Sequence, residues 1–318
     1  MATGDDPEEA SQQLHLVDGE GRANEEVGAS VPKRSRRCIG APAWVGVLTL
    51  VLLMVGLYGL TRVPQEAVPD VSPTLPEGGN EAAYPAYRPR ADWLNFHKKH
   101  KAEAEEVGKS VRVLALGDSI TEVRLETSFG HHRDNWGSLQ VWEKYYKGLG
   151  ALNLGVAGDQ TQHLLWRMQN GELPDVLQPQ SIMVAIGTNN LGYGMNAQDT
   201  VGGIKAVIQD LREQRPDALI IVMALFPRSS GISKLAGIPW PLVDEVNLLV
   251  EHMVKLKFGG DKVHFLNCNE RFLVTDSAGP QVLNHELLLE DNLHLTPAGL
   301  AEWAECASEE IRSGLTDP

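Results

Sequence analysis

Cysteine is scarce in this chain of 318 residues, and positive charge is in the minority. Because Cys38, Cys268 and Cys306 are the only cysteines, neither a framework of several disulfides nor a zinc cluster can form, whereas a single Cys268–Cys306 bridge stays open until geometry is known. The 28 basic residues are outnumbered by 42 acidic ones, which gives a formal net charge of -14. A chain without a general positive field does not attract phosphate groups, so no nucleic-acid partner is expected.

Signature motifs of several enzyme classes are also missing. The chain has neither the Gly-x-Ser-x-Gly elbow of the α/β-hydrolases nor a P-loop, and no Gly-x-Gly-x-x-Gly follows a predicted strand. Asp291 and His294 could serve as two metal ligands, but the sequence offers no third. The chemistry that we expect therefore uses no cofactor and no metal.

The N-terminal part of the chain has the pattern of a membrane anchor. Residues 1–37 are polar and mostly acidic up to the basic cluster at 33–37, and they predict a disordered tail. The run 38–61 is uncharged and longer than the ~20 apolar residues that a transmembrane helix needs. Its basic flank places the tail in the cytosol. We therefore predict a single-pass type II membrane protein with a signal-anchor helix, whose remaining chain is lumenal or extracellular (Golgi, ER or plasma membrane).

Two segments follow the predicted anchor. Residues 62–90 are rich in proline and predict a stiff, extended stem. In residues 91–318, apolar runs alternate with helical patterns, which indicates right-handed βαβ crossovers. We predict strands at 111–116, 152–156, 182–186, 219–225 and 263–266, and helices near 92–109, 138–148, 160–170, 198–214, 240–257 and 297–313. The helix at 92–109 is rich in charged residues and is expected on the surface. The expected fold class is α/β, a three-layer αβα sandwich with a five-stranded parallel sheet, flavodoxin-like.

Polar residues follow the ends of these predicted strands. Ser119 follows the first strand, Gly158 the second and Asn189 the third, while Asp291 and His294 precede the last helix. Sites in parallel sheets form beyond the carboxyl ends of the strands. We therefore expect these residues to meet at one edge of the sheet and to form an active site.

Several blocks of sequence carry a resemblance to a known family. The blocks Gly117-Asp118-Ser119, Gly158, Gly187-Thr188-Asn189-Asn190 and Asp291-x-x-His294 resemble the four signatures of the SGNH (GDSL-type) hydrolases. The stretches 153–173 and 186–190, with Gly202-Gly203-Ile204 and Phe226-Pro227-Arg228, are similar to the catalytic alpha subunits of intracellular platelet-activating-factor acetylhydrolase. The likeness covers about residues 91–312. The tail, anchor and stem lie outside it, and 131–138 looks like an insertion.

The expected mechanism is that of a serine esterase. Ser119 needs a base to become a nucleophile. His294 can take its proton while Asp291, three residues earlier, fixes the imidazole tautomer. The oxyanion would be held by the backbone N–H groups of Ser119 and Gly158 and by the side-chain amide of Asn189. The resemblance implies the same roles for these positions.

The expected substrate is a small acyl ester, with a lipid or a glycan as the alcohol. The resemblance favours removal of a small acyl group, acetyl, from a lipid ester. The predicted lumenal position favours an alternative, a carbohydrate O-acetylesterase of the secretory pathway. An alternative of another class is a non-catalytic dimeric scaffold. The resemblance also implies a homodimer, with Trp166 and Arg167 in packing and subunit contact.

Overall fold

The computed structural model describes residues 78–132, 137–229, 237, 239–260, 262–275 and 281–316. The predicted tail at 1–37, the predicted anchor at 38–61 and the first part of the predicted stem lie outside these residues. Within the described ranges, no helix combines the length and the apolar character needed to cross a membrane.

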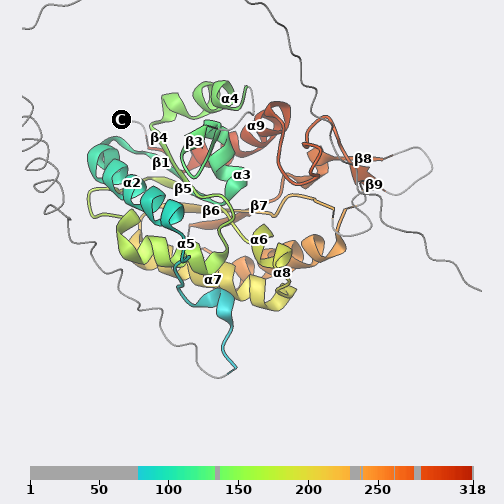
Figure 1. Cartoon of the computed structure of the whole chain (residues 1–318), viewed down its shortest axis with the longest axis horizontal. Coiled ribbons are helices and arrows are strands. Elements are labelled where there is room, and N and C mark those ends of the chain that lie inside the picture. The colour runs from blue at the N-terminus through green and yellow to red at the C-terminus, as the bar shows by residue number, and fades with distance from the viewer. Residues whose placement is uncertain are drawn as a thin grey trace, which may run out of the picture. The chain divides into compact units, whose positions relative to one another are not determined.

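Five parallel strands form the central sheet, as predicted. Its order is β4-β1-β5-β6-β7 (Figure 1). The strands are β1 (Val113–Gly117), β4 (Ala151–Gly155), β5 (Ser181–Ala185), β6 (Leu219–Met223) and β7 (Val263–Leu266). In the register, Gly117 pairs with Gly155 and with Ala185, so three neighbouring strands end at the same level. The strand order reverses at β1, and such a switch point leaves a crevice beyond the carboxyl ends of the strands.

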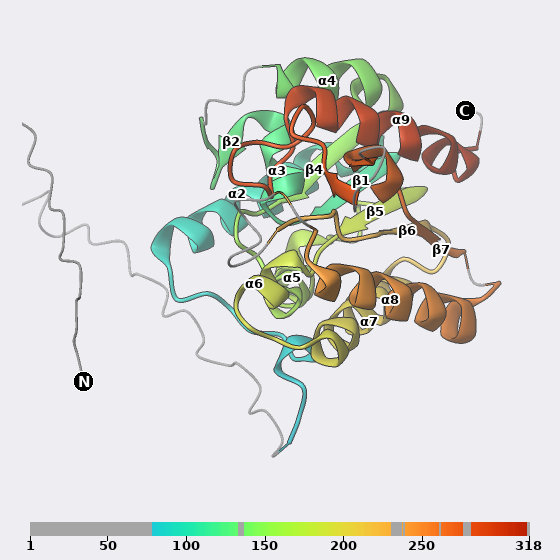
Figure 2. The same cartoon turned by 90° about the vertical axis from the view of Figure 1, so that its right-hand side faces the viewer.

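Helices cover both faces of the sheet, which confirms the three-layer α/β prediction (Figure 2). On one face, Leu114 and Leu116 pack with apolar residues of α5, α7 and α8. On the other, Val113 and Ala115 pack with α4 and α9. The alternation arises because successive side chains of a strand point to opposite faces. These helices are α4 (Ser138–Tyr145), α5 (Thr161–Arg167), α7 (Ala197–Gln214), α8 (Pro241–Phe258) and α9 (Pro297–Ser313).

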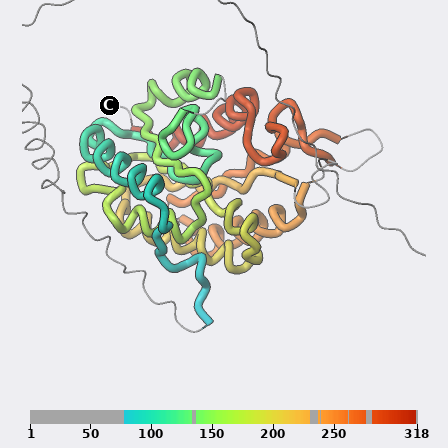
Figure 3. Tube along the Cα trace, in the orientation of Figure 1, coloured from blue at the N-terminus to red at the C-terminus, as the bar shows by residue number. Residues whose placement is uncertain are grey.

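The short elements lie between these layers or at their edges. Helix α9 follows the whole sheet in sequence but packs beside α4 (Figure 3). The remaining helices are α3 (Ser119–Glu122), α6 (Thr188–Gly192), η1 (Glu81–Ala83), η2 (Gly108–Ser110), η3 (Val123–Leu125), η4 (Lys147–Leu149), the π-helical turn η5 (Met168–Glu172) and η7 (Asn269–Phe272). Two small antiparallel hairpins pair β2 (Thr127–Ser128) with β3 (His131–His132) and β8 (Leu273–Thr275) with β9 (Gln281–Leu283).

The N-terminal part of the domain is more buried than the sequence suggested. Helix α2 (Ala91–Val107) was expected as a charged surface helix, yet Trp93, His97 and His100 lie on one buried face. These positions recur every three or four residues, which places them on one side of a helix. Residues 78–90, assigned to the stem, also belong to the folded part, because η1 packs against α7 and Ala82 is fully buried.

A disulfide joins Cys268, which follows β7, to Cys306 in α9. Their Cα atoms lie 6.1 Å apart, within the range that a disulfide spans. The pairing that the sequence left open is therefore formed.

Candidate active site

Ser119 lies at the turn between β1 and α3. Asp118 is the N-cap of α3, and its side chain accepts a hydrogen bond from the Ile120 N–H at 3.0 Å. A Cβ atom on Gly117 would lie 2.3 Å from the Thr121 Oγ1 and 2.4 Å from the Ala185 carbonyl oxygen, so only glycine fits there. As the first residue of α3, Ser119 has a backbone N–H without an intrahelical acceptor. The serine is 9% exposed, so a small reactant can reach it.

His294 contacts both Ser119 and Asp291. Its Nε2 lies 2.8 Å from the Ser119 Oγ, and its Nδ1 lies 2.6 Å from the Asp291 Oδ2. The other Asp291 oxygen accepts hydrogen bonds from the backbone N–H groups of Leu293 and His294. The tight turn between them is possible because Asn292 adopts a left-handed conformation, with φ of 54°. The structure thus brings together the three residues that the sequence analysis assigned to the triad.

The Asp291 carboxyl is held in its ionised form. Partial burial acts to raise its pKa, but the hydrogen bond to the His294 side chain and the bonds from two backbone N–H groups outweigh it and hold the pKa well below the usual range. An ionised carboxylate on Nδ1 fixes the imidazole tautomer with a proton on Nδ1. The lone pair on Nε2 then faces the serine hydroxyl.

Gly158 lies in a loop that hydrogen bonds fix on both sides. The preceding residue, Ala157, donates its N–H to Glu122 at 2.7 Å and accepts a hydrogen bond from Arg88 at 2.7 Å. Gly158 has φ of 73°, a conformation that favours glycine. The Asn189 amide donates to the Asp159 carbonyl oxygen at 2.9 Å, which ties α6 to this loop. A side-chain amide has two N–H groups, and the described residues leave the second one available to a ligand.

A buried network of ion pairs and hydrogen bonds holds Asp159, the residue that follows Gly158. Asp159 accepts hydrogen bonds from the Arg167 Nε and the Trp93 Nε1, each at 2.7 Å. Arg167 also forms an ion pair with Glu172, whose carboxylate lies 2.9 Å from the His97 Nδ1. Burial acts to raise the pKa of Glu172, but Arg167 and the bonds to the two histidines of α2 hold it well below its usual range. Sequence reasoning missed the histidines, although their spacing with Trp93 on one helical face was a usable signal.

Asp118, beside the serine, has an unusual environment. Burial raises its pKa to about 7, although the bond from the Ile120 N–H and the charges of His294 and Arg228 act in the opposite direction. Arg228 itself donates to the Thr188 side-chain and carbonyl oxygens at 3.0 and 3.2 Å. Arg228 belongs to one of the blocks that carry the resemblance, but no role in the site was predicted for it.

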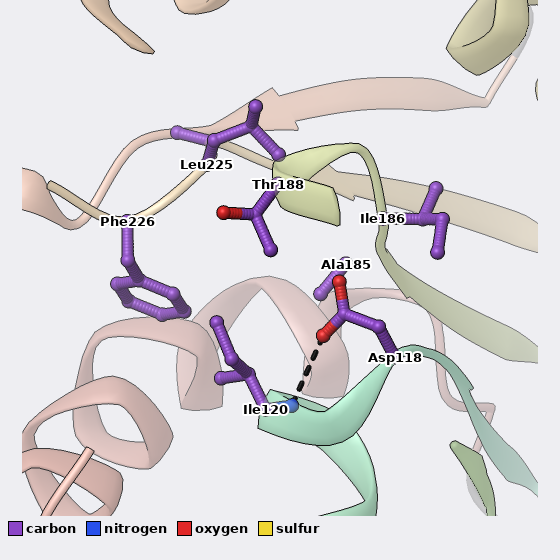
Figure 4. A pocket seen from close by; sticks show the side chains of 8 residues that line it. Asp118, Ile120, Ala185, Ile186, Thr188, Leu225 and Phe226 are labelled. Atoms are coloured by element: carbon purple, nitrogen blue, oxygen red, sulfur yellow. Dashed lines mark hydrogen bonds between the residues drawn. The ribbon is translucent and has the colours of Figure 1, made fainter. Parts of the chain in front are cut away.

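A small pocket lies next to the turn that carries Ser119, although Ser119 itself does not line it. Asp118 and Ile120, which flank Ser119 in sequence, contribute to its wall, and the Phe226 ring and Thr188 face them (Figure 4). Its cavity volume is about 10 Å³, which is close to the space that one water molecule needs. The lining residues are Asp118, Ile120, Ala185, Ile186, Thr188, Ala224, Leu225 and Phe226.

Among the described residues, no group of three or more His, Cys, Asp and Glu side chains is arranged to hold a metal ion. Asp291 and His294, the two ligands considered from the sequence, instead contact each other.

Comparison with known proteins agrees with this architecture. The GDSL-like lipase/acylhydrolase family matches residues 115–301. The alpha1 subunit of platelet-activating factor acetylhydrolase IB from Homo sapiens is 32% identical over 208 residues, which cover 65% of this chain and 77% of that protein. The alpha2 subunit from Rattus norvegicus is 31% identical over 226 residues, covering 71% and 86%. The solved structure of a GDSL-like lipase from Bacteroides thetaiotaomicron has a TM-score of 0.50 at 19% identity and covers 69% of this chain and 100% of that one.

The parallel sheet and these similarities define a hydrolase that acts on esters. More particularly, the chain belongs to the GDSL-like lipase/acylhydrolase family, within the SGNH hydrolase superfamily.

Proposed function

We propose that this protein is a serine esterase that removes a small acyl group, acetyl, from a lipid ester. The observation that carries the proposal is the hydrogen-bonded series from the Ser119 Oγ through the His294 imidazole to the Asp291 carboxylate. Nucleophile, base and orienting carboxylate at such distances are the arrangement that acyl transfer requires.

In this mechanism the Ser119 Oγ attacks the ester carbonyl carbon while the His294 Nε2 takes the hydroxyl proton. Collapse of the tetrahedral intermediate expels the alcohol, which receives that proton from His294. Water, deprotonated by His294, then attacks the acyl-serine and releases the carboxylic acid. Asp291 stabilises the imidazolium in both steps.

The oxyanion would be bound by donors from three adjacent strand ends. These are the Ser119 N–H after β1, the Gly158 N–H after β4 and the second N–H of the Asn189 amide after β5. The fixed loop around Gly158 means that little reorganisation is needed as charge develops. Each such donor contributes about 3 kcal/mol to lowering the barrier.

The names of the relatives support a small acyl group on a lipid. The relatives at 31–32% identity are named as acetylhydrolases of platelet-activating factor.

The alternative activity is that of a carbohydrate O-acetylesterase in the secretory pathway. The Cys268–Cys306 disulfide favours it, because disulfides persist in oxidising compartments and are rare in the cytosol. A lumenal domain meets glycans as well as lipids.

We also propose that residues 38–61 anchor the protein in a membrane, with the cytosolic tail at 1–37 and the domain at 91–318 in the lumen or outside the cell. The support is the uncharged run with its basic flank and the disulfide. A homodimer is a further proposal, supported by the naming of the relatives as subunits. Sedimentation that shows only monomer at micromolar concentration would remove it.

The esterase proposal is tested with Ser119→Ala. We expect this variant to fold with an unchanged melting temperature and to lose hydrolysis of acetylated lipids, acetylated sugars and aryl acetates, and we expect a fluorophosphonate to label Ser119 alone. Wild-type turnover in Ser119→Ala would refute the mechanism. A wild-type protein inert towards the whole panel would favour the non-catalytic scaffold instead.

A further inference from the structure

Arg228 lies between α6, which carries Asn189, and the turn that carries Asp291 and His294. It comes two residues after Phe226, which lines the pocket beside Ser119. Its Nη1 donates to Thr188, the neighbour of Asn189 in α6. The N–H of the next residue, Ser229, donates at 3.4 Å to the carbonyl oxygen of Asn292, within the turn that carries Asp291 and His294. The chain at 228–229 thus joins the side of the site that bears the amide to the side that bears the base.

The backbone at Arg228 is fixed from a third direction. The Trp240 N–H donates to the Arg228 carbonyl oxygen at 2.7 Å, and the guanidinium lies 5.9 Å from the centre of the Trp240 ring. The arginine is therefore held in place by α6, by the turn before α9 and by the start of α8.

The charge of Arg228 has no counter-ion in the described part of the chain. No carboxylate there forms an ion pair with it, and Asp118 and Asp291 act on it only from a longer distance. Two other arginines near the site have carboxylate partners: Arg167 pairs with Asp159 and Glu172, and Arg88 pairs with Asp159. A guanidinium without an ion-pair partner, on a segment that contacts both α6 and the turn of His294, can bind an anion.

Two buried donors at this place also lack acceptors. The Arg228 Nε and the Ser229 Oγ are buried without a hydrogen-bond partner among the described residues. Ser229 is 4% exposed. A buried donor without an acceptor destabilises the protein, so a ligand that supplies an acceptor is bound more favourably.

The free part of the guanidinium has the geometry of a bidentate donor. Nη1 is bonded to Thr188, and no described residue accepts a hydrogen bond from the edge formed by Nε and Nη2. Two parallel N–H groups on one edge match the two oxygens of a carboxylate or of a phosphodiester.

We propose that Arg228, with Ser229 beside it, binds an anionic oxygen group of the ester substrate, so that the enzyme selects esters whose alcohol or acyl part carries a phosphodiester or a carboxylate. This inference rests on the proposed esterase function. A phosphodiester would come from a lipid headgroup and a carboxylate from an acidic sugar, and the two groups share the same recognition chemistry.

The kinetic test compares matched pairs of aryl acetates on the full-length protein in detergent. The phosphodiester arm uses para-acetoxyphenyl methyl phosphate against its neutral dimethyl ester, and the carboxylate arm uses para-acetoxybenzoate against para-acetoxybenzamide. For each pair we take the kcat/KM of the anionic ester divided by the kcat/KM of its neutral partner. We expect Arg228→Gln to lower this ratio by about tenfold or more in the arm whose anionic group, phosphodiester or carboxylate, is the one that the natural substrate carries. Arg228→Lys, which keeps the charge but not the fork, should recover part of the ratio.

Arg212→Gln is the matched control. Arg212 also donates to backbone carbonyl oxygens, those of Pro216 and Ala218, but just before the amino end of β6, away from the site. It should leave the ratio unchanged. If Arg228 merely supports α6, Arg228→Gln would lower both members of each pair equally. An unchanged ratio in both arms would overturn the proposal.

A binding measurement separates this proposal from the esterase mechanism. Ser119→Ala does not turn over the esters, so calorimetry on it reports binding alone. We expect an anionic ester to bind about tenfold or more tightly than its neutral partner and to lose that preference in Ser119→Ala/Arg228→Gln. Equal binding of both members in Ser119→Ala refutes the anion site even if no ester is hydrolysed. A wild type without turnover refutes the esterase alone.

Discussion

At the scale of single residues, Asp118 makes stability depend on pH. Burial raises the pKa of this carboxyl to about 7, against about 4 in an unfolded chain. The folded protein therefore binds more protons than the unfolded chain between these values, and the free energy of unfolding falls as the pH rises through the interval. Asp118→Asn removes the titration but keeps an oxygen for the Ile120 N–H.

We expect the melting temperature of Asp118→Asn, relative to the wild type, to rise between pH 5 and pH 8. The groups that face Asp118, namely His294, Asp159 and Arg228, remain in both proteins. The difference between the two proteins therefore isolates residue 118. A difference in melting temperature that is constant with pH would contradict the assigned environment.

The sequence predicted some site residues and missed others for a physical reason. Ser119 and His294 were expected to meet because each follows or precedes a predictable element at the same sheet edge, and their side chains lie 2.8 Å apart. Glu122, in contrast, gave no signal. Its carboxylate accepts from the N–H groups of Gly130 and Ala157, two loops whose approach depends on tertiary packing.

At the scale of elements, the segment 84–90 supports the loop that carries Gly158. Arg88 donates to the Ala157 carbonyl oxygen and pairs with Asp159, on either side of Gly158. We expect Arg88→Ala to lower kcat about tenfold with little change in KM, because a displaced Gly158 N–H weakens binding of the transition state more than that of the substrate.

The control for Arg88 is Arg90→Ala. Arg90 pairs with Asp92 at the exposed surface, and such pairs contribute little. Steady-state kinetics on an aryl acetate should show kcat within about twofold of the wild type for this control. If kcat fell equally in Arg88→Ala and Arg90→Ala, the segment 84–90 would stabilise the fold as a whole and would have no specific effect on the Gly158 loop.

Helices and strands were predictable where the pattern of apolar residues was strong. The five strands alternate their side chains between two apolar layers, and each was expected within a few residues of its observed position. Helix α2 was expected at the surface because it contains many charged residues, but its opposite face is buried. Its buried histidines pair with Glu172, from a turn far along the chain, and no local pattern reveals such a pairing.

At the scale of the whole molecule, the disulfide and the basic flank of the run 38–61 are both arguments for the proposed lumenal or extracellular position of the domain. Three cysteines could be counted from the sequence, but the pairing required that α9 bring Cys306 to Cys268, with 6.1 Å between Cα atoms. The compartment matters for the substrate, because a lumenal domain meets glycans and the outer leaflet.

We expect the domain to be protected in sealed microsomes. The chain contains no Asn-x-Ser/Thr acceptor, so an Asn-x-Thr introduced in the stem before Gly78 reports translocation without background. It should be glycosylated, added protease should remove only the tail at 1–37, and Cys268 and Cys306 should resist alkylation until reduced. The matched control moves the basic residues of 33–37 to the other flank of the run, which should invert the orientation and abolish glycosylation. An unmodified acceptor together with digestion of the domain would place the domain in the cytosol. The lipid ester would then be favoured over the carbohydrate ester as the substrate.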